Sequence, residues 1–160
     1  MLLHPTIAAP IAFWDLTDRT VTGTAGVETD LSTLTIPANC VGPNSVLMMT
    51  VYFSFTSSAN NKTFKITDGG GSNIFLNVST TTNLSLLTTK VVFCANSMTS
   101  QHFHPVSSSA GLGTLNNAIA TSTVDFTTAA TLKTTGTLAD AADSITCKAF
   151  LIEIYNRSIS

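Results

Sequence analysis

The fold is decided by Leu47-Met48-Met49-Thr50-Val51-Tyr52-Phe53-Ser54-Phe55-Thr56. The odd positions of this stretch are all large and apolar, whereas the even positions after Met48 are Thr, Tyr or Ser. This period of two predicts a β-strand, because successive side chains of a strand point to opposite faces of the sheet. One face is expected in a core, and the other toward water or a partner.

Further strands are expected on both sides of this stretch, separated by turn residues. Two β-prone segments precede it, and Pro37 closes the second because proline cannot donate to a sheet ladder. The later segment that ends in Val91-Val92-Phe93-Cys94-Ala95 is continuously apolar, which suggests that both of its faces become covered. The expected strands are residues 19–27, 31–36, 47–56, 62–67, 74–78, 84–95, 121–126, 131–135 and 144–155.

This pattern predicts an all-β, single-domain, antiparallel β-sandwich, jelly-roll-like, with eight or nine strands. Residues 19–160 are expected to form the sandwich and residues 1–18 an N-terminal arm. Residues 96–120 are the least regular part, and residues 138–143 are the only plausible helical turn. The arm carries Ile11, Phe13 and Trp14, which we expect to be interface anchors because buried aromatic side chains dominate interface energies.

Composition excludes several classes of function. Of the 160 residues, 44% are hydrophobic, which is enough for a core, but only 10% are charged. The net charge is -2 and the cations are scattered, so we expect no nucleic-acid partner. No apolar run approaches the roughly 20 residues that span a bilayer, so no membrane span is expected. Pro5 and Pro10 interrupt the N-terminal apolar run, which we assign to the mature protein rather than to a secretion signal.

The sequence carries no catalytic signature, so we expect no enzyme, no catalytic residues and no cofactor. The Gly69-Gly70-Gly71 run is a turn rather than a phosphate cradle. Carboxylates that are close in sequence form local pairs in likely loops or turns, namely Asp15 with Asp18, Glu28 with Asp30, and Asp140 with Asp143. His102 and His104 would point the same way in a strand, but two ligands are too few for a metal site unless symmetry multiplies them. No metal site is therefore assigned.

Three further residue types have structural interpretations. Cys94 and Cys147 lie in apolar strand patterns and are expected to be buried free thiols, whereas a disulfide or an inter-chain bond stays open for Cys40. Glu153 interrupts an apolar run and is expected to face outward near Arg157.

Four segments carry a resemblance to small structural proteins of tailed bacteriophages. They are residues 36–47 (IPANCVGPNSVL), 56–66 (TSSANNKTFKI), 136–146 (GTLADAADSIT) and 151–156 (LIEIYN). The likeness covers about residues 31 to 156, and none of these motifs is a catalytic signature.

The resemblance implies a virion protein on the particle surface with a jelly-roll-like sandwich, often a homotrimer. Its partners would be the major capsid protein or other virion proteins. A capsid decoration (cement) protein that clamps the head is favoured, because no coiled-coil heptads or fibrous shaft are present. A tail-fibre or spike module that binds the host surface is the alternative, and a sugar-binding sandwich is a further one.

Overall fold

The structure is a computed structural model that describes residues 9–104 and 118–156. Within these ranges every regular element is a β-strand. The strands are β1 (Ile11–Asp15), β2 (Arg19–Thr22), β3 (Thr29–Ile36), β4 (Val46–Phe55), β5 (Lys62–Asp68), β6 (Ile74–Thr80), β7 (Ser85–Cys94), β8 (Gln101–Phe103), β9 (Ala120–Ser122), β10 (Ala130–Leu138) and β11 (Ser144–Tyr155).

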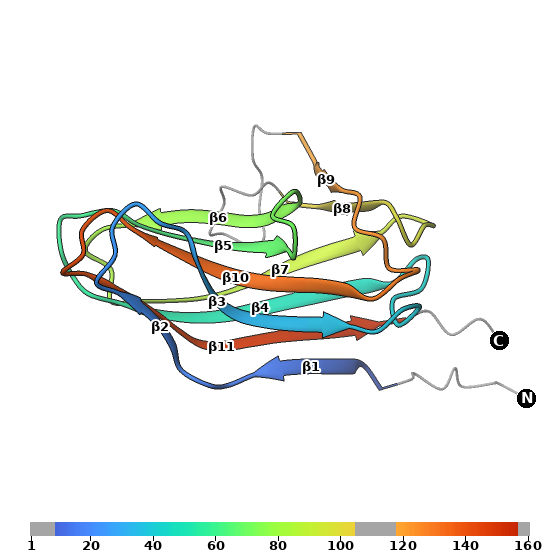
Figure 1. Ribbon diagram of the computed structural model, residues 1–160. Coiled ribbons are helices and arrows are strands. Elements are labelled where there is room, and N and C mark those ends of the chain that lie inside the picture. Colours follow the sequence, from blue (N-terminus) through green and yellow to red (C-terminus); the bar gives the residue numbers. More distant parts are fainter. Residues whose placement is uncertain (1–8, 105–117, 157–160) are drawn as a thin grey trace, which may run out of the picture.

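The strands form two antiparallel sheets that pack as two layers (Figure 1). The larger sheet has seven strands in the order β1-β11-β4-β7-β8-β9, and β2 pairs with the other half of the β11 edge that β1 occupies. The smaller sheet has four strands in the order β3-β10-β5-β6. The predicted all-β antiparallel sandwich is therefore confirmed.

The strand pairs are nested in the way that defines a jelly roll. β5 pairs with β6, β4 with β7, β3 with β10, and β1 together with β2 pairs with β11. Each pair encloses the previous one along the chain, and successive pairs alternate between the two sheets. Because this nesting is the topology of a double-sheet jelly roll, the expected jelly-roll character is confirmed. β8 and β9 lie outside the nesting and extend the larger sheet beyond β7.

The expected number of eight or nine strands is too low, because the described residues form eleven. One of the two additional strands, β8, has three residues and lies within the region expected to be irregular, whereas β9 is a shortened form of the strand expected at residues 121–126. A period of two cannot be recognised in so short a run. The other additional strand, β1, lies in the segment expected to form the arm and pairs along β11.

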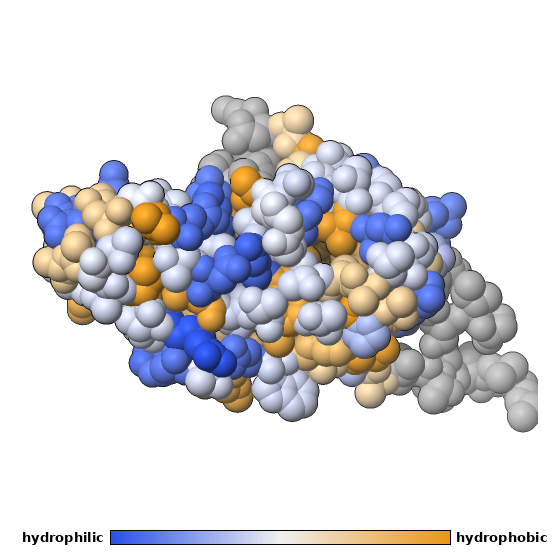
Figure 2. Space-filling view, viewed as in Figure 1, coloured by the Kyte–Doolittle hydropathy of each residue, from blue (hydrophilic) through white to orange (hydrophobic). Residues whose placement is uncertain are grey.

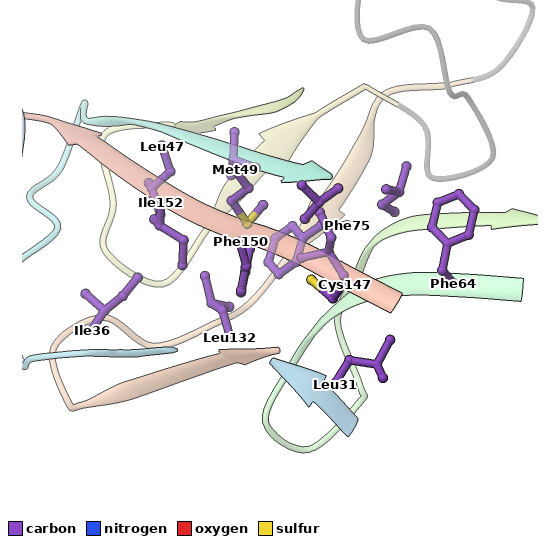
Figure 3. Packing of buried hydrophobic residues seen from close by; sticks show 14 of the residues in the cluster. Leu31, Ile36, Leu47, Met49, Phe64, Phe75, Leu132, Cys147, Phe150 and Ile152 are labelled. Carbon is purple, nitrogen blue, oxygen red and sulfur yellow. The ribbon is translucent and has the colours of Figure 1, made fainter. Parts of the chain in front are cut away.

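β4 follows the alternation that its sequence predicts. Its five odd-numbered residues are buried, and the side chains between them face away from the core. Phe53 and Phe55 contact Phe64 of the opposite sheet with ring centroids 4.9 and 5.3 Å apart. Figure 3 shows residues of both sheets filling the space between them. Burial of each large apolar side chain contributes about 1.5–3 kcal/mol, so this layer provides most of the stability.

A β-bulge reverses the alternation in β11. Cys147 pairs with Phe53 and Ala149 with Tyr52, which leaves Lys148 as the extra residue. Inward positions are therefore odd before the bulge and even after it, so Cys147 and Phe150 are both buried. Without the extra residue, one half of the strand would turn its apolar side chains away from the core.

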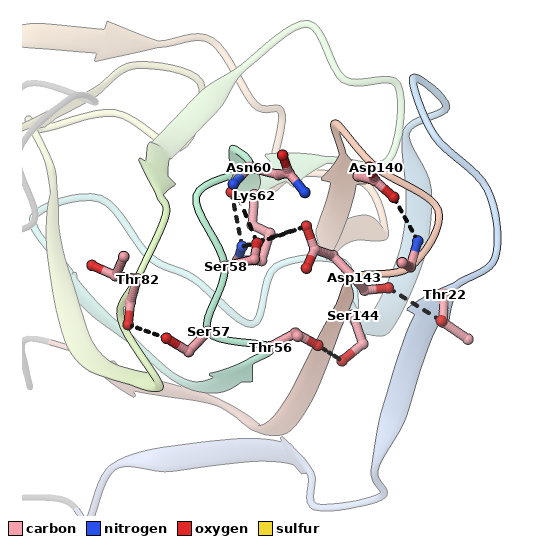
Figure 4. A network of polar contacts seen from close by, with 11 residues as sticks. Thr22, Thr56, Ser57, Ser58, Asn60, Lys62, Thr82, Asp140, Asp143 and Ser144 are labelled. Atoms are coloured by element: carbon pink, nitrogen blue, oxygen red, sulfur yellow. Dashed lines mark hydrogen bonds and ion pairs between the residues drawn. The ribbon is translucent and has the colours of Figure 1, made fainter.

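A buried ion pair joins the first residue of β5 to the turn before β11 at one end of the sandwich (Figure 4). Lys62 and Asp143 are nearly inaccessible to solvent, and Lys62 Nζ lies 3.7 Å from Asp143 Oδ2. Ser58 donates to Asp143 at 2.9 Å and accepts from Lys62 at 2.8 Å. Burial raises the pKa of Asp143, but hydrogen bonds from Ser58 and Asn60 and the Lys62 charge outweigh it, so this pKa lies below its ordinary value. The pair therefore connects the start of β5 to the turn that leads into β11.

The expected helical turn at residues 138–143 is wrong, because the segment forms a tight turn between β10 and β11. Asp140 Oδ1 accepts a hydrogen bond from the Ala142 amide at 2.8 Å, and the Asp143 amide donates to the Asp140 carbonyl at 3.2 Å. Aspartate side chains compete with a helix by binding nearby backbone amides, which favours the turn.

Cys94 and Cys147 are buried free thiols, as predicted. Burial raises the pKa of Cys94 to about 11 and also raises the pKa of Cys147. Cys40 is half-buried and its thiol is free. Because the thiolate is the reactive form, the two buried cysteines act as small apolar core residues.

Candidate protein interface

The outer face of the larger sheet is apolar. The strand register places Trp14 beside Leu151, Ala149 beside Tyr52 and Tyr52 beside Leu87 on this face. We call this surface the apolar sheet face, and its members are Trp14, Val46, Met48, Tyr52, Leu87, Val91, Phe93, Ala149, Leu151 and Tyr155.

The largest side chains of the apolar sheet face are open to solvent. Leu87 is 69% exposed, Trp14 61%, Phe93 52%, Tyr52 42% and Tyr155 39%. They come from four neighbouring strands, β1, β4, β7 and β11, and therefore form one continuous surface. Soluble proteins usually expose apolar residues singly and rarely as contiguous patches. A contiguous apolar surface of this kind therefore marks a site of contact with another molecule.

Two pairs of polar side chains on the outer side of the larger sheet bind one another. Thr50 and Thr89 lie opposite each other on β4 and β7, and their hydroxyl oxygens are 2.8 Å apart. The Tyr155 hydroxyl donates to Glu153 at 3.3 Å. Desolvation, followed by the negative charge of Glu153, raises the pKa of Tyr155. The face can therefore be covered without leaving these hydroxyls unpaired.

Charge is almost absent from this surface. Among the outward positions of β1, β4, β7 and β11 beyond the bulge, Glu153 is the one ionised side chain. The neighbouring cation, Lys148, is at the bulge and binds Asp18. The surface is thus suited to an apolar partner rather than to a strongly charged one.

The outer face of the smaller sheet has the opposite character. We call it the polar sheet face, and its members are Asp30, Thr33, Thr35, Thr63, Lys65, Asn77, Ser79, Thr131, Lys133, Thr135 and Thr137. Over the region where β3 and β10 run in Figure 1, Figure 2 shows mainly hydrophilic and pale residues with hydrophobic ones between them.

The polar sheet face satisfies its own hydrogen-bonding groups. Thr63 and Ser79 are 2.7 Å apart, and Lys133 Nζ lies 2.9 Å from Asp30 Oδ1. Glu28 reaches over this face from the loop after β2 and binds Lys65 and Thr135. A hydrogen bond from Lys65 lowers the pKa of Glu28, burial opposes this shift, and a hydrogen bond from Thr135 assists it. Such a surface is stable in water without a partner.

The three interface candidates from the sequence all lie on β1, but on different sides of it. Trp14 points outward and belongs to the apolar sheet face. Ile11 and Phe13 lie opposite Ile154 and Ile152, on the side that faces the core. Phe13 packs against the core, and Ile11 is exposed at the sheet edge. Their role as anchors stays a prediction.

The remaining residues of the apolar sheet face were not singled out from the sequence. The apolar run of residues 91–95 is the sequence signal that could have revealed them, because it predicts a strand covered on both faces. Val92 and Cys94 do point into the core, but Val91 and Phe93 point outward and Phe93 is exposed. The apolar run predicts that the outer side of β7 is also covered, but the described residues leave Phe93 exposed there.

The histidine pair is divided between a strand and the residue after it. His102 lies in β8 and pairs with Phe93 and Thr121, and His104 follows β8. Nδ1 of His104 is buried and has no hydrogen-bond partner among the described residues. No group of three or more His, Cys, Asp or Glu side chains that could hold a metal occurs in the described ranges. Arg157, the expected partner of Glu153, lies outside them.

The local acid pairs contribute to surface ion pairs and turns. Asp18 binds Lys148, Glu28 binds Lys65, and Asp30 binds Lys133. These are the ordinary structural roles of carboxylates on a β-sandwich. The part of the chain that the structure describes holds no helix with the length and apolar character that a bilayer crossing requires.

Comparisons with known proteins give no family. No protein-family model and no curated protein matches the chain. Among solved structures, one of infectious bursal disease virus, Gx strain, is similar with 12% identity and a TM-score of 0.35, over 100% of this chain and 41% of that one. The VP2 subviral particle of the same virus is similar with 10% identity and a TM-score of 0.30, over 96% and 44%. The chain thus spans less than half of either protein, and likeness at these scores carries no argument. The strand pairing alone defines the class, a jelly-roll domain with one apolar and one polar sheet face.

Proposed function

We propose that this chain is a virion structural protein of a tailed bacteriophage. In this proposal it is a capsid decoration protein that binds the head surface and stabilises the shell through protein–protein contacts. The observation that carries the proposal is the apolar sheet face, which needs a protein partner to cover it. The resemblance of four sequence segments to small phage structural proteins supports the setting. The jelly roll is shared by viral capsid and lectin domains and by cupins, so it supports the proposal without deciding it.

The proposed mechanism is physical and involves no reaction. A standard protein interface buries about 1,200–2,000 Å² in total, and its apolar part contributes about 25 cal/mol per Å² before the cost of association is subtracted. Repetition over the symmetric copies of a shell raises the overall avidity, because each further contact forms at high effective concentration. Modest contacts per copy are therefore enough to clamp neighbouring capsid subunits.

Trp14 is the proposed anchor of the arm, together with Ile11 and Phe13. Trp14 is exposed on the outermost strand of the larger sheet, where it can reach a neighbouring protein. Tryptophan is enriched among the residues that dominate interface energies. The opposite surface, the polar sheet face, would then face solvent, where its neutral hydroxyl groups tolerate close neighbours on the lattice.

The test is to add purified protein to phage heads that lack it and to image the particles by cryo-electron microscopy. Density on the head lattice, together with an increased melting temperature of the heads, is the expected result. Density only at the tail would favour the fibre or spike module instead. Binding on a glycan array without any binding to particles would support a sugar-binding sandwich and overturn the proposal.

A further inference from the structure

We infer that the apolar sheet face binds a second copy of this chain. This inference rests on the proposed function in using the same surface, and it deepens it by naming the partner. The self-associated form would be the unit that meets the shell, through the β1 edge of each copy with its exposed Ile11, whereas Trp14 would lie between the two copies. The partner is inferred from the size, the charge and the hydrogen bonding of the face.

The size of the face matches the area that stable self-association needs. β4 and β7 contribute ten residues each to this face, β11 contributes residues 149–155 and β1 contributes five residues. At about 3.3 Å per residue and about 4.8 Å between strands, they cover roughly 500 Å² of flat sheet. The accessible area is larger because side chains stand out from the sheet. A standard interface buries about 800 Å² per partner, so the face with its projecting side chains is of the same order of size as one side of a stable interface.

The charge of the face favours a copy of itself over a charged partner. Two identical surfaces bring together the same charges, and self-repulsion prevents association where a patch carries many charges of one sign. Here Glu153 is the one ionised side chain among the outward positions named above. A basic partner would find only this single carboxylate to bind. An identical apolar face gains from all the exposed apolar side chains at once.

The hydrogen bonding of the face points the same way. A site for one specific foreign partner presents polar groups that only that partner satisfies. At the centre of this face Thr50 and Thr89 already bind each other, and at the end of β11 Tyr155 already binds Glu153. Small Ala149 lies beside Tyr52, which leaves room for a large side chain from the facing copy. The face is therefore suited to dry, apolar contact with its own duplicate.

The experiment measures the mass of the full-length protein in solution by sedimentation equilibrium, without any particle present. The wild-type chain is expected to form a homo-oligomer with a Kd below about 10 μM, which corresponds to a free energy of roughly −7 kcal/mol or more favourable. Leu87→Asp buries an unpaired charge on association, so it is expected to raise the Kd at least about a hundredfold. Leu87 is largely exposed in the single chain, so the variant should keep its fold.

The matched control is Val27→Asp. Val27 is also an exposed apolar residue, but it lies in the loop between β2 and β3, away from the apolar sheet face. Its Kd should stay within about threefold of wild type, as expected for a site outside the contact. Glu153→Gln removes the one charge that self-association buries, so it should leave the Kd unchanged or lower it, whereas a basic foreign partner would bind this variant more weakly.

The inference and the proposed function can fail separately. A monomeric wild-type chain at about 100 μM, or a Leu87→Asp variant that associates like wild type, would overturn the inference. Phe93→Ser serves as a second variant if Leu87→Asp does not fold. An oligomer that binds no phage head would support the inference and contradict the proposed function. A monomer that binds the head would contradict the inference and support the proposed function.

Discussion

The two outer faces of this sandwich are built from similar strands and yet behave as opposites. On the polar sheet face, threonines, lysines and carboxylates pair across strands, as Thr63 does with Ser79 and Lys133 with Asp30. On the apolar sheet face, large side chains such as Leu87 and Trp14 stand in solvent. The comparison shows that the inward side chains of a sheet determine the fold, whereas its outward side chains indicate whether the surface contacts water or another protein.

The contrast also explains why so few charges suffice for this protein. β-branched threonine fits a pleated strand and offers both a donor and an acceptor, so neighbouring hydroxyls satisfy each other without ions. The polar sheet face is therefore complete in water. The apolar sheet face is complete only when another apolar surface covers it. The following predictions test this distinction, from the largest expected effect to the smallest.

The largest expected difference is between the losses in free energy of unfolding caused by substitutions at inward and outward positions of one strand. Phe150 and Leu151 are adjacent in β11, but Phe150 is fully buried and Leu151 faces outward. Phe150→Ala should lower the free energy of unfolding by about 3–5 kcal/mol, because it leaves a cavity in the core. Leu151→Ala should cost less than about 1 kcal/mol in the dissociated chain. Urea denaturation at low protein concentration measures both, and equal losses would show that the outer face is part of the core.

Trp14 should separate binding from stability. Trp14→Ser is expected to change the free energy of unfolding of the single chain by less than about 1 kcal/mol, because the side chain is mostly exposed. It should weaken association with the proposed partner by about 2 kcal/mol or more, as expected for a tryptophan hot spot. Denaturation curves and titration with empty heads measure the two effects. A large stability loss with unchanged binding would place Trp14 in the fold rather than in the interface.

The smaller sheet offers a similar comparison along β10. A Cβ atom on Gly136 would lie 3.0 Å from Val21 Cγ1 and 3.1 Å from Leu31 Cδ1, so Gly136→Ala should cost about 1–3 kcal/mol through overpacking. Thr137, the next residue, faces outward opposite Thr63. Thr137→Val should stay within about 0.5 kcal/mol of wild type, because both residues are β-branched. Thermal unfolding compares the two, and a costlier Thr137→Val would contradict the assignment of the faces.

The smallest effect concerns the pH dependence of the polar sheet face. The pKa of Glu28 is lowered from its ordinary value of 4.5, first by the hydrogen bond from Lys65. A lowered folded-state pKa stabilises the protein above the ordinary value, and this contribution is lost as the pH falls through the folded-state pKa. Glu28→Gln should therefore lower stability by less than about 1 kcal/mol at pH 7, since the ion pair is partly exposed, and by less still below pH 4. Melting temperatures between about pH 3 and 7 measure it, and a loss that grows in acid would contradict this sign.

Much of the fold could be predicted because its signals are local. The alternation of residues 47–56 depends only on neighbouring positions, and each inward residue of β4 is buried as expected. The nested strand pairing joins segments far apart in the chain, so the pattern alone indicated a sandwich but not which strands pair. The bulge at Lys148 was also hidden, because a single extra residue in an apolar run leaves no mark in the composition.

The interface was only partly predictable for the same reason. Trp14 was singled out because it is a tryptophan in an apolar segment. Leu87, Tyr52 and Ala149 are far apart in sequence and become neighbours only through the register of β7, β4 and β11. Their alignment depends on the bulge in β11, since a one-residue slip would turn Leu151 inward and Phe150 outward. The sequence pattern of a single strand therefore could not predict the apolar sheet face.

The most direct test of the apolar sheet face is hydroxyl-radical footprinting of the protein alone at low concentration and in its assembled form. The aromatic and sulfur-containing side chains of the face are reactive probes, and Trp14, Met48, Tyr52 and Phe93 should all be labelled in the dilute chain and protected in the assembly. Val27, which is exposed in the loop between β2 and β3, should be labelled equally in both. Unchanged labelling of these four residues on assembly would contradict the account.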